Sequence, residues 1–313
     1  MVIYEYPFNE KVNIENSVLA LGFFDGVHIA HRDLLLRARR IAEENNLLFG
    51  VFTFKSDGDI KPGAQRLYDD SEKAEMLEAL GADFVIFADF SKISDASAED
   101  FVGSMLVKDI GCQICVAGFN FRFGKGASGS ANDLCKYMNK YGAKAVICEE
   151  IKARGEVTLS ASLIRELLKA GDIRAATEML GAPYYIKGRV SPGRQVGRRL
   201  GFPTVNIPIA EGKLIPRPGV YRTATPIDGK IYIGVTNIGI CPTFDARSVH
   251  LEGYLLDFEG DLYNRELRVF LLDFLRDERK FSSPEELQKQ IDIDKNRVIT
   301  ESGDISWQDL GLK

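Results

Sequence analysis

Residues 18–31 read VLALGFFDGVHIAH, and this stretch decides the fold of the first half of the chain. Residues 18–21 are typical of a buried strand, the glycine and aspartate cluster after them of a turn, and the segment from Arg32 of a helix with apolar residues at helical spacing. His28 and His31 therefore lie at a helix N-terminus, where unpaired backbone N–H groups favour an anion. The pair predicts a phosphate site. The plainer alternative is that both rings cap the helix and pack beneath the strand.

The alternation of short apolar runs with helical segments continues to about residue 182 and predicts a parallel α/β fold. We expect strands at 18–22, 47–54, 84–87, 114–118 and 145–148. We expect helices at 32–45, 71–80, 98–107, 131–141, 162–170 and 173–180. Sheets of this class bind ligands at the carboxyl ends of their strands, which is where His28 and His31 fall.

After residue 183 the chain changes to short runs with frequent glycine and proline, which predicts a small all-β domain, most simply a barrel. The expected strands lie at 184–190, 204–207, 220–225, 231–237, 251–256 and 267–274. A last helix begins with Ser283 as N-cap, Pro284 as first helical residue and Glu286 as reciprocal capping acid. We therefore expect two domains, residues 1–183 and 184–313.

The composition is that of a globular protein, with 313 residues, 45% hydrophobic and 27% charged. A net charge of −5 gives no general attraction for nucleic acid or an acidic membrane surface, so we expect neither as a partner. No apolar run approaches the length of a membrane span and the N-terminus lacks the pattern of a signal peptide, so we expect a cytoplasmic protein. Cys112 and Cys115 form a C-x-x-C, for which buried strand residues are favoured over a metal or redox pair.

The string GFFDGVHIAH, residues 22–31, resembles the G-x-F-D-G-V-H-x-G-H motif of prokaryotic FAD synthetases, a form of the adenylyltransferase H-x-G-H motif. The resemblance implies that His28 and His31 stabilise the transition state of adenylyl transfer. It implies nucleotide contacts at Gly22, Phe24 and Asp25. Ala30 stands where the family has glycine, and its methyl group narrows the approach of a triphosphate.

Two further segments extend this resemblance. Residues 159–165, LSASLIR, are similar to the family's I-S-S-T-x-I-R, which implies that Ser160, Ser162 and Arg165 hold the triphosphate, while Ala161 lacks a hydroxyl. A hydroxyl and an arginine in the first turn of a helix form an anion clamp, although alone they more simply mark a capped helix.

The second segment, residues 118–129, resembles the family's G-x-[DN]-F-x-F-G-x-x-x-x-G loop. This similarity implies flavin contacts at Asn120 and Phe123. A flexible, solvated basic loop is the alternative. A weaker element is residues 55–58, where the chain reads KSDG and family members read D-P-H-P.

In the second half, residues 188–206 resemble the riboflavin kinase signature that ends in P-T-x-N. Glycines let backbone N–H groups approach phosphates, which fits Gly188, Gly193 and Gly197. Thr204 and Asn206 alternate on a strand, so their oxygens point to one side and suit Mg²⁺. Edge-strand polar groups and turn glycines are the plainer alternatives.

Three other residues complete the implied kinase site. Glu252 corresponds to the family's base for the flavin 5′-hydroxyl, although Gly253 and Tyr254 replace a small apolar residue and a histidine. The resemblance implies flavin contacts at Asn237 and at Arg276, which lies in LRDERKF, residues 275–281. A solvated charge run is the alternative for that last segment.

Resemblance over nearly the whole chain identifies a member of the prokaryotic bifunctional riboflavin kinase/FMN adenylyltransferase, or FAD synthetase, family. It implies a Rossmann-like nucleotidyltransferase domain followed by a kinase barrel with a terminal helix. Riboflavin, FMN, FAD, ATP, ADP and pyrophosphate are the implied substrates and products, with Mg²⁺ accompanying ATP. Two alternatives remain: a working kinase joined to a slow or inactive adenylyltransferase domain, and a non-catalytic flavin-binding regulator.

Overall fold

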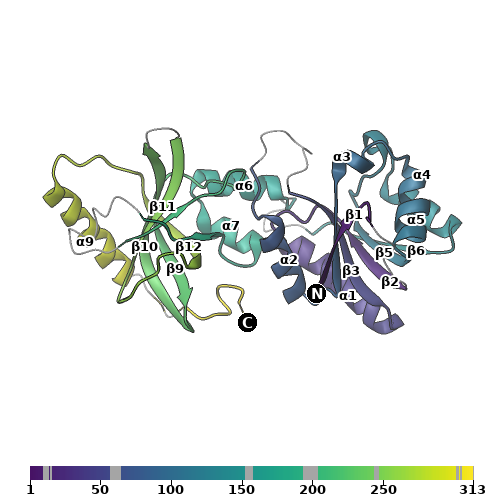
Figure 1. The fold of residues 1–313 in the computed structure, drawn as a ribbon, viewed down its shortest axis with the longest axis horizontal. Coiled ribbons are helices and arrows are strands. Elements are labelled where there is room, and N and C mark those ends of the chain that lie inside the picture. Colours follow the sequence, from purple (N-terminus) through teal and green to yellow (C-terminus); the bar gives the residue numbers. More distant parts are fainter. Residues whose placement is uncertain are drawn as a thin grey trace. The chain divides into compact units, whose positions relative to one another are not determined.

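A computed structural model describes residues 1–9, 14, 16–56, 65–151, 158–192, 204–242, 247–300, 303 and 305–312. The chain divides into two compact units, Met1–Ala161 and Ser162–Lys313 (Figure 1). This division lies earlier than the boundary expected at residue 183, because helix α7 (Ile173–Leu180) packs on strand β12 (Glu266–Arg276) of the second unit. The functional domains 1–183 and 184–313 stay a prediction.

The first unit is built on a six-stranded parallel sheet in the order β1-β4-β3-β2-β5-β6. Its strands are β1 (Val2–Tyr6), β2 (Ser17–Leu21), β3 (Leu48–Phe54), β4 (Phe84–Ala88), β5 (Cys112–Gly118) and β6 (Lys144–Cys148). The five strands expected from the sequence are present. The edge strand β1 escaped prediction because Val2 and Ile3 are exposed and no helical segment precedes it.

Helices cover both faces of this sheet (Figure 1). They are α1 (Ile29–Asn45), α2 (Asp70–Ala79), α3 (Phe90–Ile93), α4 (Ala98–Asp100), the π-helix η1 (Phe101–Asp109), the 3₁₀ turn η2 (Lys125–Ala127) and α5 (Ala131–Lys140). Alternate residues of β2 point to opposite faces, so Val18 joins one apolar core beneath α1 and α2, and Leu19 joins the other beneath η1 and α5. This burial on both faces explains the continuous apolar run that predicted the strand.

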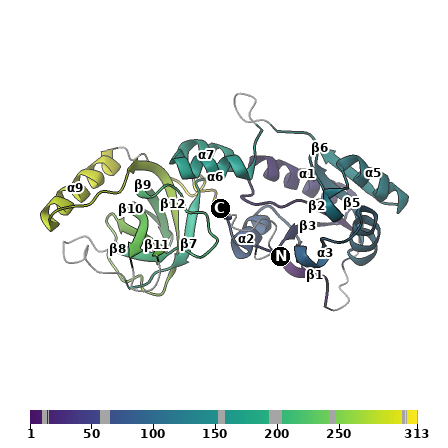
Figure 2. The same cartoon turned by 90° about the horizontal axis from the view of Figure 1, so that it is seen from above.

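The second unit is an antiparallel barrel in the order β7-β12-β9-β10-β11-β8 (Figure 2). Its other strands are β7 (Tyr185–Arg189), β8 (Thr204–Pro208), β9 (Gly219–Ile227), β10 (Lys230–Pro242) and β11 (Arg247–Leu255). The two ends of this order meet, since Ser191 N donates to Asn206 O at 2.8 Å. The expected α/β class with an all-β second half is therefore confirmed.

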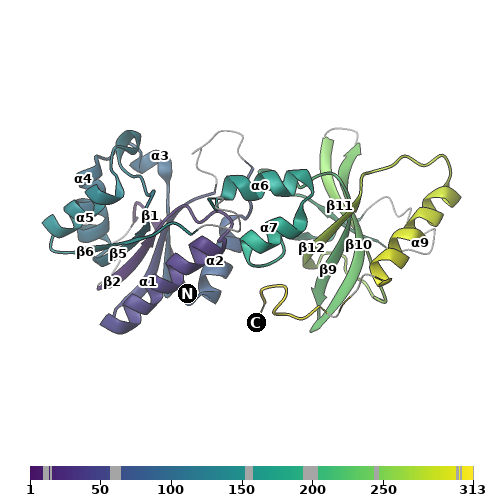
Figure 3. The same ribbon diagram turned by 180° about the vertical axis from the view of Figure 1, so that it is seen from behind.

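Helix α9 (Pro284–Thr300) lies along β10, and helix α6 (Ala161–Ala170) precedes α7 (Figure 3). Ser283 caps α9 as predicted, because its Oγ accepts from Glu286 N at 3.2 Å. The reciprocal bond differs from the prediction: the Glu286 carboxylate accepts from the N–H and hydroxyl of Ser282, at 2.9 and 2.8 Å.

The cysteine pair of the C-x-x-C lies in β5, where both residues are buried and free. Burial raises the pKa of Cys112 to about 12, so its thiol stays protonated and unreactive at neutral pH. This favours the buried-strand reading of the motif. No helix in the described ranges is long and apolar enough to span a membrane.

Two candidate active sites

The two histidines meet at the N-terminus of α1. His28 is the N-cap residue, only 4% exposed, and its Nδ1 accepts from His31 N at 3.3 Å. The rings stack with centroids 3.6 Å apart and planes 16° from parallel. His28 thus caps the helix, as the plainer alternative expected, and the same geometry places both imidazoles at the anion-favouring helix end.

Both imidazoles are uncharged at neutral pH. Burial lowers the pKa of His28 to about 4. Burial lowers the pKa of His31 well below its usual value, and electrostatic repulsion from Lys73 and from a protonated His28 lowers it further. The rings therefore offer neutral N–H donors, which can stabilise a growing negative charge.

Two features of this loop are typical of a functional site. His31 Nδ1 is buried and has no hydrogen-bond partner among the described residues, a state that costs about 1–3 kcal/mol. Phe24 and Val27 adopt left-handed backbone conformations, with φ of 48° and 40°, which bulky residues rarely do. Such strain concentrates at functional sites.

The pKa of His28 predicts how stability depends on pH. Because this pKa in the folded chain lies below its ordinary value of 6.5, the unfolded chain binds the proton more tightly. Stability is therefore lost as pH falls from about 6.5 to about 4, by roughly 1.4 kcal/mol for each pH unit. We expect the melting temperature to fall less between pH 7 and pH 5 in His28→Asn, which keeps a capping side chain but cannot titrate. An equal fall in the variant and the parent would contradict this assignment.

The other predicted residues of the loop make contacts that hold the loop and His31 in place. The Phe24 ring is fully buried and packs edge-on against His31, with centroids 5.2 Å apart. The buried Asp25 carboxylate accepts from Leu67 N at 3.1 Å. Gly22 is needed because a Cβ there would lie 2.8 Å from the Phe24 ring. The structure gives these three residues supporting contacts, and nucleotide contact by any of them stays a prediction.

Lys73 belongs to the same edge of the sheet and was not predicted from the sequence. It lies on α2, only 2% exposed, and its Nζ donates to Phe54 O at 3.1 Å, where β3 ends. Asp70 Oδ1 is 3.7 Å from the ammonium, and the Phe23 ring centroid is 5.8 Å away. The available signal was a charged residue one turn before buried Leu77, on the apolar face of a predicted helix.

In the loop after β5, the two residues predicted to bind flavin lie in different environments. Asn120 is exposed. Phe123 is buried in the core, where its ring lies 5.3 Å from that of Phe101 and 5.7 Å from that of Phe121. Phe123 thus anchors the loop, and its flavin contact stays a prediction.

The start of α6 brings together two of the three predicted triphosphate residues. Arg165 Nη1 lies 3.5 Å from Ser162 Oγ, one turn along the helix. Ser160 precedes the helix. This places a hydroxyl and a guanidinium on one first turn, and their role as an anion clamp stays a prediction.

In the barrel, strand register aligns four predicted kinase residues in one row. Asn206 on β8 pairs with Glu252 on β11, and Glu252 pairs with Asn237 on β10. Asn237 pairs with Val220 on β9, and Val220 pairs with Arg276 on β12. Directly opposed residues share one face of a sheet. The register therefore brings these side chains, distant in sequence, to one face of the barrel.

Asn206 is held firmly within this row. It is 6% exposed, its Nδ2 donates to Ser191 Oγ at 2.9 Å, and its Oδ1 lies 2.9 Å from His250 Nδ1. A carbonyl oxygen has two lone pairs, so Oδ1 keeps one for a further partner. Thr204 lies two positions earlier on the same face and is exposed. Both residues offer oxygen atoms, the donor type that Mg²⁺ prefers, and their role as its ligands stays a prediction.

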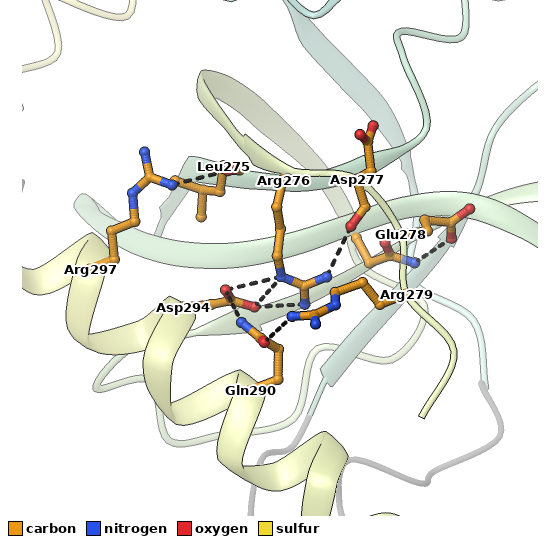
Figure 4. Close-up of polar contacts among 9 residues, drawn as sticks. Leu275, Arg276, Asp277, Glu278, Arg279, Gln290, Asp294 and Arg297 are labelled. Atoms are coloured by element: carbon orange, nitrogen blue, oxygen red, sulfur yellow. Dashed lines mark hydrogen bonds and ion pairs between the residues drawn. The ribbon is translucent and has the colours of Figure 1, made fainter. Parts of the chain in front are cut away.

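The far end of the row carries contacts that the sequence did not indicate. Asn237 Nδ2 donates to Glu278 Oε1 at 3.1 Å. Gly239 makes room for this carboxylate, because a Cβ there would lie 1.9 Å from Glu278 Oε1. The Arg276 guanidinium binds the Asp294 carboxylate of α9 (Figure 4). Arg276 is thus an ordered residue and not part of a solvated charge run.

The predicted phosphate glycines divide into two groups. Gly188 lies on β7, where a Cβ would come within 2.5 Å of Ile207 Cγ2, so glycine is required for β7 to approach β8. Gly193 and Gly197 lie outside the described residues.

Comparisons with known proteins match the two halves of the chain to two different enzyme families. The FAD synthetase family model matches residues 10–162, and the riboflavin kinase family model matches residues 180–300. Similar curated proteins are named bifunctional riboflavin kinase/FMN adenylyltransferase. The relative from Listeria monocytogenes is 34% identical over 286 residues, covering 89% of this chain and 90% of the relative. That from Bacillus subtilis is 32% identical over 292 residues, covering 90% and 92%.

The Escherichia coli K12 relative, with the same name, is 34% identical over 285 residues and covers 88% of this chain and 90% of its own. A crystal structure described as a macrolide-efflux protein from Streptococcus pneumoniae has a TM-score of 0.86 and 27% identity. The superposed residues cover 96% of this chain and 100% of the Streptococcus pneumoniae chain. The described fold is therefore shared along nearly the whole chain.

Proposed function

The chain belongs to the bifunctional riboflavin kinase/FMN adenylyltransferase family, and on that premise we propose which of its residues carry each reaction. The enzyme phosphorylates riboflavin with ATP to give FMN and ADP. It then transfers the adenylyl group of a second ATP to FMN, giving FAD and pyrophosphate. The match of both halves of one chain to the two family models carries this conclusion.

For the kinase reaction, Glu252 is the proposed base. Its carboxylate takes the proton of the riboflavin 5′-hydroxyl while that oxygen attacks the γ-phosphorus of ATP and ADP leaves. The support is its central place in the row, between Asn206 and Asn237. Asn237 and Arg276, farther along the row, are the proposed flavin contacts.

Thr204 and Asn206 are the proposed Mg²⁺ ligands. A bound Mg²⁺ would neutralise charge on the phosphates of ATP. The residues' own part is to fix the ATP phosphates beside Glu252, and the hydrogen bonds of Asn206 to Ser191 and His250 hold its amide oxygen in one orientation.

The Mg²⁺ assignment predicts a specific defect. We expect Thr204→Val to raise the Mg²⁺ concentration for half-maximal kinase activity by about tenfold, since one oxygen ligand is lost without a change of shape. Mg²⁺ titrations of riboflavin phosphorylation measure this. Thr204→Ser, which restores the hydroxyl, should behave like the parent. A valine variant with the parent's Mg²⁺ requirement would remove Thr204 from the site.

For adenylyl transfer, an oxygen of the FMN phosphate attacks the α-phosphorus of ATP and pyrophosphate leaves. We propose that His28 and His31 donate hydrogen bonds to the oxygens that gain charge, while Ser162 and Arg165 hold the triphosphate. The neutral imidazoles at the helix N-terminus support this role. We also propose a cytoplasmic location, on the support of the four described free cysteines.

One assay tests the function as a whole. The chain is incubated with riboflavin, ATP and Mg²⁺, and the flavins are separated by chromatography over time. FMN should form first and FAD after it. FMN that accumulates without FAD would overturn the adenylyltransferase half, an outcome that the substitutions at Ala30 and Ala161 would permit. Bound riboflavin without product would indicate a non-catalytic binding protein.

A further inference from the structure

The Arg276 side chain at the end of the kinase row is held from outside the barrel by α9. Its Nε lies 3.1 and 3.0 Å from Asp294 Oδ1 and Oδ2, and its Nη2 lies 2.7 Å from Oδ2 (Figure 4). Its Nη1 donates to Asp277 O at 3.0 Å. Paired charge-assisted bonds of this kind fix the plane of a guanidinium as well as its position.

The carboxylate that holds Arg276 is itself fixed. Asp294 is 4% exposed, and its Oδ1 accepts from Gln290 Nε2 at 3.0 Å. Gln290 Oε1 in turn accepts from Arg279 Nη1 at 2.7 Å (Figure 4). The carboxylate therefore has little freedom to move away from Arg276.

The helix carrying Asp294 is docked by contacts other than this ion pair. Val298, one turn later, is fully buried in an apolar cluster with Val220 and Val235 of the barrel. Arg297 Nη1 donates to Leu275 O at 3.0 Å. A buried ion pair often adds no net stability over apolar residues of similar size. Its distinctive effect here is to determine the orientation of Arg276.

We infer that Asp294 is a positioning residue for the kinase reaction, holding the Arg276 guanidinium in the orientation that receives the flavin. The inference rests on the proposed function, because it requires Arg276 to contact riboflavin. Arginine has many rotamers, so a guanidinium aligned in advance loses less freedom when the flavin binds. Asp294 acts on binding and not on proton transfer, which belongs to Glu252.

The test is Asp294→Asn in the full chain, with riboflavin and ATP varied separately. We expect the riboflavin KM to rise about tenfold, the effect of weakening one hydrogen bond from a charged group. The kinase kcat should stay within about threefold, since the interaction is made equally in the ground and transition states. FAD formation from supplied FMN, measured on the same sample, should not change.

Asp228→Asn is the matched control. Asp228 also binds an arginine with both oxygens, at 2.8 and 2.7 Å from Arg265, but this pair is exposed and lies outside the row. The same substitution there should leave the riboflavin KM at the parent value.

A double-mutant cycle with Arg276→Met separates the possible outcomes. If Asp294 acts through Arg276, the double variant has the KM of Arg276→Met alone. An additive increase overturns the inference. An unchanged KM in Asp294→Asn beside a raised KM in Arg276→Met overturns the inference and leaves the proposed function intact. An unchanged KM in Arg276→Met overturns the flavin assignment and the inference with it.

Thermal unfolding shows whether each variant is folded at the assay temperature. If Asp294→Asn is not, Asp294→Glu provides the test, because it keeps the charge and shifts the carboxylate by one methylene. A raised riboflavin KM with an unchanged kcat then supports positioning. A parent-like KM shows that any carboxylate on α9 suffices and overturns it.

Discussion

Glu252→Gln should lower the rate of riboflavin phosphorylation by about 10²- to 10⁴-fold, the usual contribution of a general base. The amide nearly matches the carboxylate in shape, and the backbone at position 252 keeps its pairing with Asn206 and Asn237. The glutamine amide, unlike the carboxylate, cannot accept the proton of the 5′-hydroxyl at the moment of attack. Initial rates of FMN formation with saturating riboflavin and ATP measure the effect.

The same protein sample supplies the internal control for Glu252→Gln. FAD formation from added FMN should continue at the parent rate, because the residues proposed for adenylyl transfer are not in the barrel. Glu266→Gln, an exposed position at the start of β12 beside Lys187, should leave both rates unchanged. A Glu252→Gln variant with a parent-like kinase rate would remove Glu252 as the base.

Local sequence patterns predicted most of the architecture. The run at 18–21 specifies a strand buried on both faces, and β2 lies in the interior of the sheet order with its alternate residues in two cores. The loop and helix after it follow from glycine, aspartate and helical spacing. Each of these signals acts over a few residues, which is why sequence alone captures them.

The row of kinase residues could not be predicted, although each member was. Alignment of Asn206, Glu252, Asn237 and Arg276 depends on strand register and on an irregularity between Phe274 and Arg276. A one-residue slip would turn a strand's side chains to the other face, and no local pattern fixes register to that accuracy.

The residues that contact the predicted site residues were also missed by the sequence analysis. Glu278 and Asp294 contact the kinase row through tertiary contacts, and each is locally an ordinary loop or helix charge, whereas Lys73 was marked only by its place on the apolar face of a predicted helix. A buried charge is informative only once its burial is known. Phe24 and Phe123, for which the resemblance implies nucleotide and flavin contacts, both have rings buried in the core, and those contacts stay predictions.

His31→Ala should lower FAD formation from supplied FMN by about 10²- to 10³-fold, the usual cost of removing one donor to a developing oxyanion. The ring is held for this role by stacking on His28 and by the edge of Phe24. At neutral pH it is uncharged, so the variant loses a hydrogen-bond donor and not a cation. His31→Gln, which restores an N–H donor, should recover part of the rate.

The kinase half again serves as the control for His31. FMN formation from riboflavin should match the parent in His31→Ala, and Asn45→Ala, at the exposed far end of α1, should leave both reactions unchanged. If FAD formation persists at the parent rate, the α-phosphate is stabilised elsewhere and the paired histidines only cap α1. Equal loss of both reactions with an unchanged melting temperature would instead contradict two separate sites. The two assays on one variant thus decide whether the strained loop after β2 is a catalytic element or a structural one.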